Sequence, residues 1–314
     1  MEKSPIDISV ILATYKRPEV LEITLNGFCS LESDGLSWEL IIVDNADDSR
    51  TREVVNGYSS VLPVQYMVEK KRGKNNALNT AIEHARGELF LFTDDDVIVD
   101  RRWLLEIREG TRRWPDHMVF GGRILPLYPK DSIDIPLDER SLNMAFVVAD
   151  WGFDEGPYQA HKVWGPNMVV RRDIFRTGWR FNPNVGPSGS NYIMGSESEF
   201  NERLEKAGYV PIYLPGSLVH HIIREEQLTR KWLYKRAFRY GRFCAVKYAN
   251  LQNGRLLFHV PIQTLKETLV AFAKFAVSIL INDRKRYYRF GVRSYQMAGM
   301  VYQFRKGIEI NRQE

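Results

Sequence analysis

Residues 87–96 read Gly-Glu-Leu-Phe-Leu-Phe-Thr-Asp-Asp-Asp, an apolar run that ends in three consecutive acids. The run is apolar at consecutive positions, which predicts a buried strand over residues 88–93. Neighbouring carboxylates repel one another, and their burial is costly unless a cation compensates. On an extended backbone Asp94 and Asp96 face the same way and Asp95 faces the other. Such a pair of oxygen donors suits Mg²⁺ or Mn²⁺ shared with phosphate oxygens, and a solvated acidic turn is the alternative.

Short apolar runs alternate with helical patterns in the residues before this strand. We expect strands over 8–12, 39–43 and 64–68, and helices over 18–28, 48–58 and 75–85. Asp48 or Ser49 is the expected N-cap of the second helix, and Gly87 the expected stop of the third. This alternation predicts a mainly parallel sheet covered by helices, in which ligands bind beyond the carboxyl ends of the strands. Thr14, Asp44 and the acid triplet follow such ends, so we expect them to share one cleft.

The region from 120 to 225 has a mixed pattern. Strands or strand edges are expected over 121–124, 163–167 and 209–214, a mobile loop over 186–195, and a helix over 198–207 that ends at Gly208. His220 and His221 are expected to follow a strand and a Pro-Gly turn.

Charge is unevenly distributed along the 314 residues. Residues 211–314 hold 19 Lys and Arg against 6 Asp and Glu, a net charge of +13, whereas residues 1–210 carry −8. A basic C-terminal region indicates an anionic partner, such as a membrane surface, a nucleic acid or a charged substrate. A solvated helical surface is the alternative.

Four blocks of sequence, in this order and spacing, carry a resemblance to a known family. They are Ser9-Val-Ile-Leu-Ala-Thr-Tyr-Lys-Arg-Pro18, Ile41-Ile-Val-Asp-Asn45, Gly73-Lys-Asn-Asn-Ala-Leu-Asn79 with Ala85-Arg-Gly87, and Thr93-Asp-Asp-Asp96. Over roughly residues 7–240 the chain resembles family 2 glycosyltransferases of the GT-A fold. No Gly-x-Gly-x-x-Gly follows the first strand, which argues against a dinucleotide-binding site.

The resemblance implies an α/β GT-A fold, with a mainly parallel central sheet sandwiched by helices and a helical C-terminal extension. It implies a catalytic domain over residues 1–225, with a nucleotide-binding half at 1–100 and an acceptor half at 101–225. Residues 226–314 would form the basic helical C-terminal region.

The resemblance also implies a reaction, the inverting transfer of a sugar from a nucleotide-diphosphate sugar to a hydroxyl acceptor, with a UDP-sugar as the expected donor. It assigns the nucleotide-sugar site to Ala13, Thr14, Tyr15, Asp44, Arg72, Lys74, Asn79, Asp94 and Asp95, with Trp164 on the donor-sugar side. Asp44 would accept a hydrogen bond from the base, while Arg72 or Lys74 would offset phosphate charge. Asp94 would reach the ribose and Asp96 would hold Mn²⁺ or Mg²⁺, with Asp95 able to do either.

Inverting transfer requires a general base for the acceptor hydroxyl. Family members usually carry an Asp within a Gly-Glu-Asp-x-Glu-Phe-like segment, and this chain reads Gly195-Ser-Glu-Ser-Glu-Phe200. Alignment on the final Glu-Phe places Glu197 at the Asp position, whereas a shift of one residue places Ser198 there. The alternative is that Glu197 and Glu199 only favour the helix start, where carboxylates are stabilised.

Two further residues are implied by the resemblance. His221 would be a third metal ligand beside Asp96 and Asp94, because some GT-A relatives use a His here, and a purely structural role is the alternative. Trp164 lies in a Trp-Gly-Pro-Asn segment that resembles one lining the donor sugar, and core packing is the alternative for Trp164 and for Trp151.

The C-terminal region is expected to be helical. A helix is expected over 229–250, and the apolar stretch 269–281 would span roughly 20 Å as a helix, short of the roughly 30 Å hydrocarbon core. The basic and aromatic segment Arg284-Lys-Arg-Tyr-Tyr-Arg289 follows it. An apolar helix with such a flank favours an anchor in the membrane interface. A helical lid and a dimer interface are the alternatives.

Together with the family resemblance, these features lead us to expect a cytoplasmic enzyme at the inner face of the membrane; the resemblance implies that it builds polysaccharide or other cell-envelope glycans on a glycan or lipid-linked acceptor. No run of about 18 apolar residues occurs, so we expect no transmembrane helix, and we expect no nucleic-acid partner. A nucleotidyltransferase would carry glycines after the first strand, where residues 14–18 have none. A non-catalytic nucleotide-sugar binder remains the second alternative.

Overall fold

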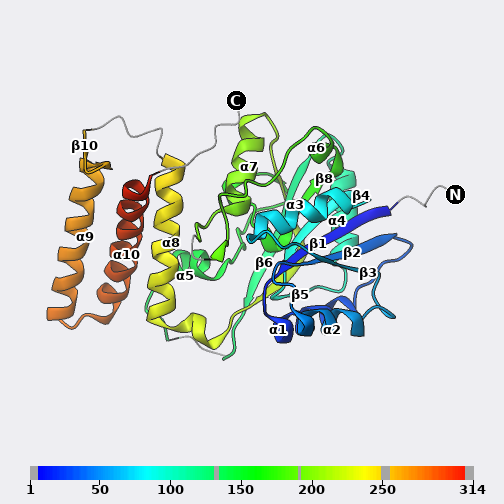
Figure 1. The fold of residues 1–314 in the computed structure, drawn as a ribbon, viewed down its shortest axis with the longest axis horizontal. Helices are drawn as coiled ribbons and strands as arrows, with labels where there is room; N and C mark the ends of the chain where they lie inside the picture. The colour runs from blue at the N-terminus through cyan, green and yellow to red at the C-terminus, as the bar shows by residue number, and fades with distance from the viewer. Residues whose placement is uncertain (1–5, 131–133, 190–191, 249–254, 308–314) are drawn as a thin grey trace. The chain divides into compact units, whose positions relative to one another are not determined.

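The computed structural model describes residues 6–130, 134–189, 192–248 and 255–307. These residues belong to two compact units (Figure 1). The first unit comprises Met1–Leu127, Val147–Pro183 and Ser196–Ile222, and the second comprises Tyr128–Phe146, Asn184–Gly195 and Ile223–Glu314. The second unit therefore includes two segments from the middle of the chain as well as its C-terminal part.

The first half of the first unit is a parallel sheet in the order β3-β2-β1-β4. Its strands are β1 (Ile6–Thr14), β2 (Trp38–Asp44), β3 (Val64–Val68) and β4 (Gly87–Asp94), and its connecting helices are α1 (Pro18–Phe28), α2 (Ser49–Gly57) and α3 (Lys74–His84). All seven elements occur where the sequence predicts them, within two residues at every end. Asp48 caps α2 by accepting a hydrogen bond from the Thr51 amide, as expected.

Both faces of this sheet are buried. Val10 and Leu12 of β1 pack with Leu21 and Leu25 of α1 in one hydrophobic cluster. Ile11, between them in sequence, packs with Ala77 and Leu78 of α3 in another. Alternate strand residues point to opposite faces, so helices on both sides explain why the middle parts of β1, β2 and β4 are apolar at consecutive positions.

The sheet becomes mixed beyond β4. It continues through β8 (Met168–Arg171), β6 (Val119–Leu127), β9 (Ile212–Ile222) and β5 (Val97–Val99), with the short β7 (Gly156–Pro157) paired to β9. Here β6 and β9 pair in parallel, whereas the pairs β4–β8, β6–β8, β5–β9 and β7–β9 are antiparallel. The helices are α4 (Trp103–Arg113), α6 (Arg172–Arg176) and α7 (Ser196–Lys206). The expected α/β class is confirmed.

Gly87 does not stop a helix, contrary to the sequence prediction. The α3 helix ends at His84, because Ala85 already has an extended backbone. Gly87 instead begins β4, where a Cβ atom would lie 2.4 Å from the Ser9 amide nitrogen. The glycine therefore permits close approach of β1.

Two other local predictions were wrong. The segment expected to be a strand over 163–167 contains a 3₁₀ turn, Gly165–Asn167, and β8 begins only at Met168. Pro166 lacks an amide donor, which suits a turn better than a strand. The expected Pro-Gly turn at Pro215 lies inside β9, where the β6–β9 register shifts between Gly122 and Arg123.

The expected loop over 186–195 contains an isolated bridge between Gly186 and Ile193. Residues 190 and 191 of this segment lie outside the described residues. The α7 helix starts two residues earlier than predicted, and Gly208 follows it with a φ of 96°.

The second unit is mainly helical. Its elements are α5 (Glu139–Phe146), α8 (Arg230–Tyr248), the β10–β11 hairpin (Leu256–Leu257 and Val260–Pro261), α9 (Ile262–Leu280) and α10 (Arg284–Lys306). In Figure 1 the red α10 lies between the yellow α8 and the orange α9, against both of which it packs. The helix predicted over 229–250 is α8, although Asn250 lies outside the described residues. Within the described parts of the chain, no helix combines the length and the apolar character needed to cross a membrane.

Candidate active site

The carboxyl ends of β1, β2 and β4 lie side by side in the first unit. In the sheet register Thr14 is opposite Asp44, and Ala13 is opposite Asp94. The acid triplet therefore begins where the strand prediction places it, at the shared edge of a parallel sheet.

Arg17 forms ion pairs with two acids of the triplet, a role that the sequence analysis did not predict. Its guanidinium forms ion pairs with Asp95 and with Asp96, the latter at 2.9 Å. Burial would lower the pKa of Arg17, but the charges of Asp95, Asp96 and Asp94 together raise it, so Arg17 remains charged. The residue stands just before Pro18 at the start of α1, so the end of the β1 loop brings it over the triplet.

Asp95 is held from several sides. Its side chain is fully buried and accepts a hydrogen bond of 2.7 Å from the Thr14 hydroxyl. The Thr24 hydroxyl on α1 donates to the Asp95 carbonyl at 2.9 Å. Burial raises the pKa of Asp95 to about 6 even though Arg17 acts in the opposite direction. The hydrogen bond between Thr14 and Asp95 therefore holds the ends of β1 and β4 together at the site.

Lys74, the first residue of α3, bridges two carboxylates that are far apart in sequence. Its Nζ atom lies 2.6 Å from Asp94 Oδ1 and 2.7 Å from Glu197 Oε1. Burial lowers the pKa of Lys74, but Asp94 and Glu197 raise it by more. The structure therefore brings Glu197 to the acid triplet through this shared cation.

Glu197 lies in the first turn of α7, where the helix dipole favours a carboxylate. The preceding Ser196 donates a hydrogen bond to the Asn75 side chain on α3. Gly165 passes directly beside Glu197, since a Cβ atom there would lie 2.5 Å from Glu197 Oε1. Glu199 instead pairs with Arg203 on its own helix at 2.7 Å. Only Glu197 of the two acids therefore faces the triplet.

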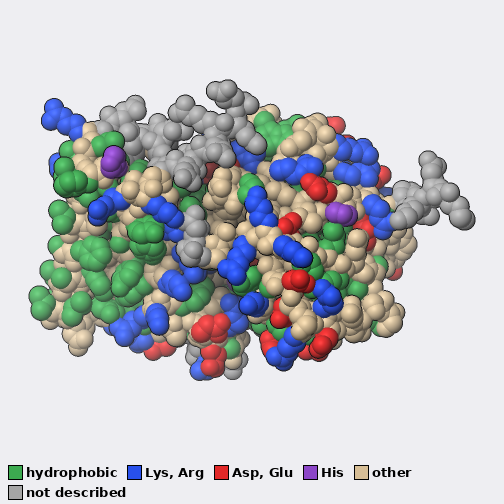
Figure 2. Space-filling model, in the orientation of Figure 1, with side chains coloured by type: hydrophobic (Ala, Val, Ile, Leu, Met, Phe, Trp, Pro, Cys, Tyr) green, Lys and Arg blue, Asp and Glu red, His purple; other side chains and the backbone are tan. Residues whose placement is uncertain are grey.

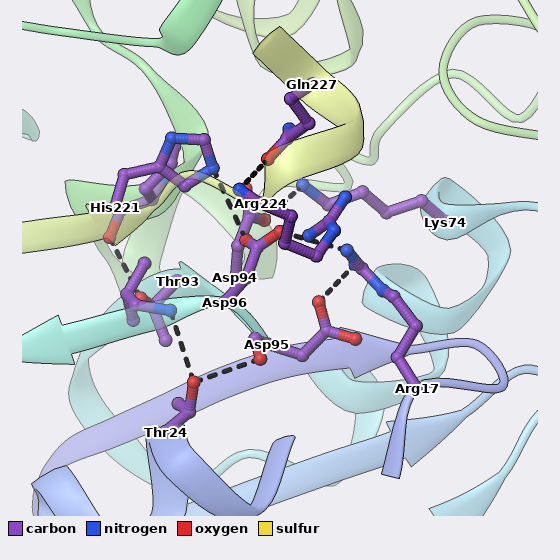
Figure 3. Close-up of polar contacts among 12 residues, drawn as sticks. Arg17, Thr24, Lys74, Thr93, Asp94, Asp95, Asp96, His221, Arg224 and Gln227 are labelled. Carbon is purple, nitrogen blue, oxygen red and sulfur yellow. Dashed lines mark hydrogen bonds and ion pairs between the residues drawn. The ribbon is translucent and has the colours of Figure 1, made fainter. Parts of the chain in front are cut away.

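His221 approaches Asp96 from β9. Its Nε2 atom lies 3.5 Å from Asp96 Oδ1, and Figure 3 shows Asp96 between His221 and Arg17. This position follows from the pairing of β5 with β9, which sets His221 opposite Val97. Among the described residues, no three His, Cys, Asp or Glu side chains are grouped so as to hold a metal ion. The predicted trio is incomplete because the Asp94 carboxylate is turned to Lys74.

The donor chemistry nevertheless fits a divalent cation shared with a phosphate group. Asp96 and His221 supply an oxygen and a nitrogen, which suit Mn²⁺. Metals bound together with substrate phosphates often have only one or two protein carboxylate ligands.

A pocket of about 240 Å³ lies at the ends of β1 and β2. It is lined by Tyr15, Lys16, Asn45, Ala46, Asp47, Lys70 and Arg72. Tyr15 exposes 43% of its surface, so its ring is available for stacking. The pocket has three basic side chains and one acidic one, which favours an anionic ligand. Tyr15 and Arg72 are predicted site residues and Asn45 lies at a strand end predicted to border the cleft, whereas Lys16 and Lys70 were missed.

Asn45 shapes this pocket. Its side-chain amide donates to the carbonyls of Glu69 and Lys71 at 2.7 and 2.9 Å, and its Oδ1 atom accepts from the Gly73 amide at 2.7 Å. These bonds fix the loop that carries Arg72. The only sequence signal was its position directly after Asp44.

The Asp44 carboxylate is hydrogen-bonded within the turn that follows β2. Its carboxylate accepts hydrogen bonds from the amides of Ala46 and Asp48, at 2.8 and 2.7 Å, and from the Tyr66 hydroxyl at 2.8 Å. Burial and the Asp44 carboxylate raise the pKa of Tyr66 to about 12, so the hydroxyl remains a donor. Asp44 orders the loop that lines the pocket, and its predicted contact with the base stays a prediction.

Three other predicted residues have structural partners. The Asn79 amide exchanges two hydrogen bonds with the backbone of Phe181, at 2.9 and 3.0 Å. Trp164 is half-buried and packs edge-on against Trp151, with 5.3 Å between the ring centroids. Ala13 packs on the cluster beneath α3. Their roles in sugar or nucleotide binding remain predictions.

Asn167 holds the turn that carries Gly165. Its side chain is fully buried and accepts hydrogen bonds from Trp103 Nε1 and the Ser217 hydroxyl, both at 3.0 Å, while donating to the Arg123 carbonyl at 2.9 Å. The Thr93 hydroxyl donates to the Pro166 carbonyl at 2.9 Å. The turn beside Glu197 is therefore fixed to β4, α4 and β6.

Comparison with known proteins places this geometry in a family. Residues 9–179 match the model for "Glycosyl transferase family 2". The chain is 25% identical over 309 residues to the succinoglycan biosynthesis protein ExoM of Rhizobium meliloti, covering 96% of this chain and 94% of that protein. It is 23% identical to a glucosyl-dolichyl phosphate glucuronosyltransferase of Haloferax volcanii, over 74% of this chain and 75% of that protein.

A solved structure shares the fold. The mannosyltransferase PcManGT from Pyrobaculum calidifontis, in complex with GDP-Man and Mn²⁺, superimposes with a TM-score of 0.61 at 17% identity, covering 95% of this chain and 87% of that one. The GT-A-like architecture with C-terminal helices is thereby confirmed. Since the family match covers more than half of the sequence, the chain belongs to glycosyl transferase family 2.

Proposed function

We propose that this glycosyltransferase moves a hexosyl group from a nucleotide-diphosphate sugar to a hydroxyl acceptor with inversion at the anomeric carbon. One observation carries the proposal: the acid triplet, Lys74 and Glu197 meet beside a basic pocket at the ends of β1, β2 and β4. The relatives' names, which include a polysaccharide biosynthesis protein and a glucuronosyltransferase, support the same class of reaction.

The pocket at Tyr15 is the proposed nucleoside site. Tyr15 stacks on the base, and Lys16, Lys70 and Arg72 offset the charge of the diphosphate. At about 240 Å³ the pocket is smaller than the roughly 300 Å³ at which sites for drug-sized ligands begin, so it holds only part of the donor. A UDP-sugar is the proposed donor, as the family resemblance implies.

Asp96 and His221 are the proposed protein ligands of Mn²⁺ or Mg²⁺, and Asp94 is proposed for the ribose with Lys74 beside it. The 3.5 Å separation of Asp96 and His221 and the ion pair of Asp94 with Lys74 support this assignment. The related mannosyltransferase bound to Mn²⁺ supports metal use in this fold. When bound, such a cation stabilises the negative charge that develops on the leaving diphosphate.

Glu197 is the proposed general base. It accepts the proton of the acceptor hydroxyl as that oxygen attacks the anomeric carbon from the side opposite the leaving nucleotide. No covalent enzyme intermediate forms, so a single displacement inverts the configuration. Lys74, 2.7 Å from Glu197 Oε1, orients the carboxylate before the acceptor arrives.

The stereochemical outcome tests this proposal. The wild-type protein, incubated with UDP-α-sugars and Mn²⁺, is expected to release free sugar slowly by transfer to water. Proton NMR at early times, before mutarotation, is expected to show the β-anomer. Initial release of the α-anomer, or no turnover of any nucleotide sugar, would contradict the proposal.

We further propose a glycan or lipid-linked acceptor and a location at the inner face of a membrane, in the synthesis of polysaccharide or cell-envelope glycans. The net charge of +13 over residues 211–314 supports attraction to an anionic surface. The name of the dolichyl-phosphate relative supports a lipid-linked acceptor.

Replacement of Arg17 by Met is expected to lower the thermal stability of the protein and to make that stability depend on a bound metal ion. Asp95 and Asp96 would lose their cation, at a cost of about 1–3 kcal/mol for the partly exposed guanidinium. Thermal unfolding should show a lower Tm, and Mn²⁺ should raise the Tm of this variant more than that of the wild type. The control is Arg50→Met, which removes an exposed ion pair with Glu19. Equal Tm values for the two variants would contradict the role of Arg17.

Substitution of Gly165 by Ala is expected to slow turnover about tenfold with little loss of stability, because the added Cβ displaces the end of the Glu197 side chain. Measurement of kcat and Tm separates the two effects. Gly57→Ala is the matched control, since no atom lies within 4 Å of a Cβ there. Unchanged kcat in Gly165→Ala would show that the position of Glu197 is not critical.

A further inference from the structure

Helix α9 buries residues that are unusual for a helix on a water-exposed surface. Its buried side chains are Thr264, Ala271 and Ser278, which are small or polar and recur every seven residues. They form one stripe along the helix. A surface helix of a globular protein normally buries its large apolar residues instead. In lipid, by contrast, small residues and hydroxyls face neighbouring helices.

The opposite face of α9 is apolar and exposed. Leu269 is 72% exposed and Leu280 is 84% exposed, and five neighbours share this exposure: Val270, Phe272, Val277, Ile279 and Ile281. Figure 2 shows hydrophobic side chains gathered over the part of the second unit that contains α9, at the left of the view. Contiguous apolar surface of this kind marks an interaction site.

The β10–β11 hairpin adds a second apolar feature to this unit. Leu256, Leu257 and Phe258 are exposed, Phe258 by 75%. Phe258 and His259 have φ angles of 52° and 64°, a left-handed conformation that bulky residues rarely adopt. Asn-Gly is the usual choice for such a turn. The hairpin therefore holds an aromatic ring outward at a conformational cost.

Cations surround the apolar face. A groove of about 800 Å³ is lined by Arg230, Lys231, Lys235 and several tyrosines, including Tyr234 and Tyr287. It adjoins α9, because the Phe275 ring lies 6.1 Å from that of Tyr234 and 5.1 Å from that of Tyr287.

Further basic residues follow the end of α9. Arg284, Lys285 and Arg286 are exposed in the first turn of α10. Apolar side chains with a basic and aromatic rim are the composition of an element that lies in a membrane interface.

The basic residues around the apolar face of α9 favour one binding partner for that face over another. A second copy of the chain would bring basic rims together, and like charges oppose that contact. An anionic bilayer neutralises the rim and offers hydrocarbon to the apolar face. The 19 residues of α9 are about 28 Å long. Lys266 and Lys274 are exposed along it, so α9 suits a position in the plane of the interface.

We propose that the outward face of α9 and the tip of the β10–β11 hairpin insert into the surface of an anionic phospholipid bilayer, with the groove on α8 and α10 contacting lipid phosphates. The inference does not depend on the transfer chemistry. It goes beyond charge attraction, because it requires burial of apolar side chains in the acyl region.

Vesicle binding tests the proposal on the full chain. The wild type is expected to sediment with vesicles of phosphatidylcholine containing about 30% phosphatidylglycerol, and to stay largely bound at about 0.5 M salt, where exposed charges are screened. Leu269→Ser combined with Leu280→Ser is expected to weaken binding at high salt about tenfold or more. Both side chains are exposed, so the fold and donor hydrolysis should be unchanged.

The control is Val61→Ser, an equally exposed apolar residue of the first unit, which should bind vesicles like the wild type. Absence of wild-type binding at low salt would overturn the proposal. Equal binding of the double variant and the wild type at high salt would do the same, since it would leave charge as the only attraction. Light scattering that shows a wild-type dimer and a monomeric double variant, with unchanged vesicle binding, would assign the face to self-association instead.

Discussion

Glu197→Gln is expected to lower kcat by about 10²–10⁴-fold, the contribution typical of a positioned general base. The amide keeps the size and hydrogen-bonding capacity of the side chain but cannot accept the proton of the acceptor hydroxyl. Because the proposed donor site lies at Tyr15 and the acid triplet, the Kd for UDP should stay within about twofold of wild type. Steady-state kinetics with a competent acceptor, together with calorimetric titration of UDP, measures both effects.

Glu199→Gln is the matched control. Glu199 lies two residues away on the same helix and pairs with Arg203 rather than with Lys74. Its substitution should leave kcat within about threefold of wild type, as expected for a surface change. Glu197→Asp restores the residue type usual at this position and is expected to keep part of the activity. A Glu197→Gln enzyme with wild-type kcat, or a Glu199→Gln enzyme without activity, would move the base elsewhere.

Asp96→Ala is expected to reduce kcat/KM by about 10²–10³-fold through loss of metal-assisted stabilisation of the leaving diphosphate. The Asp96 carboxylate lies between Arg17 and His221, 2.9 Å from Arg17 Nη1 and 3.5 Å from His221 Nε2. In the variant, Mn²⁺ should no longer increase the affinity for UDP. Thermal shift of the UDP complex with and without Mn²⁺ reports this directly.

Two controls accompany this variant. Asp116→Ala removes one exposed carboxylate without touching the site and should behave like wild type. His220→Ala should leave the response to Mn²⁺ intact, whereas His221→Ala should weaken it, because only His221 faces Asp96. An Asp96→Ala protein that responds to Mn²⁺ like the wild type would rule out Asp96 as the metal ligand.

The sequence predicted the nucleotide-binding half well because its signals are local. An apolar run bounded by turn residues predicts each parallel strand, and Pro18 or Asp48 marks the start of a helix. The carboxyl ends of parallel strands lie at the same edge of a sheet regardless of how the helices pack. The sequence could therefore place Thr14, Asp44 and Asp94 together.

The partners of these residues could not be predicted in the same way. Lys74 and Glu197 are separated by 123 positions, and only the packing of α7 near α3 reveals their ion pair. Arg17 looks like an ordinary loop cation until the triplet lies beneath it. Gly87 resembles a helix stop, and only the approach of Ser9 shows why the residue must be small.

The second unit shows another limit. The apolar pattern of residues 269–281 correctly predicted a helix, and the structure extends it to Ile262–Leu280. The sequence alone does not show which face is covered. The buried stripe of Thr264, Ala271 and Ser278 is visible only in the folded unit, and it reverses the usual expectation for an apolar helix.

A crystal structure of the wild-type protein with UDP and Mn²⁺ tests the central claim most directly. We predict the uracil ring against Tyr15, the diphosphate beside Lys16, Lys70 and Arg72, and Mn²⁺ bound by Asp96, His221 and phosphate oxygens. A nucleotide bound away from the ends of β1, β2 and β4, or Mn²⁺ bound to the diphosphate with no contact to the Asp94–Asp96 cluster, would contradict the account.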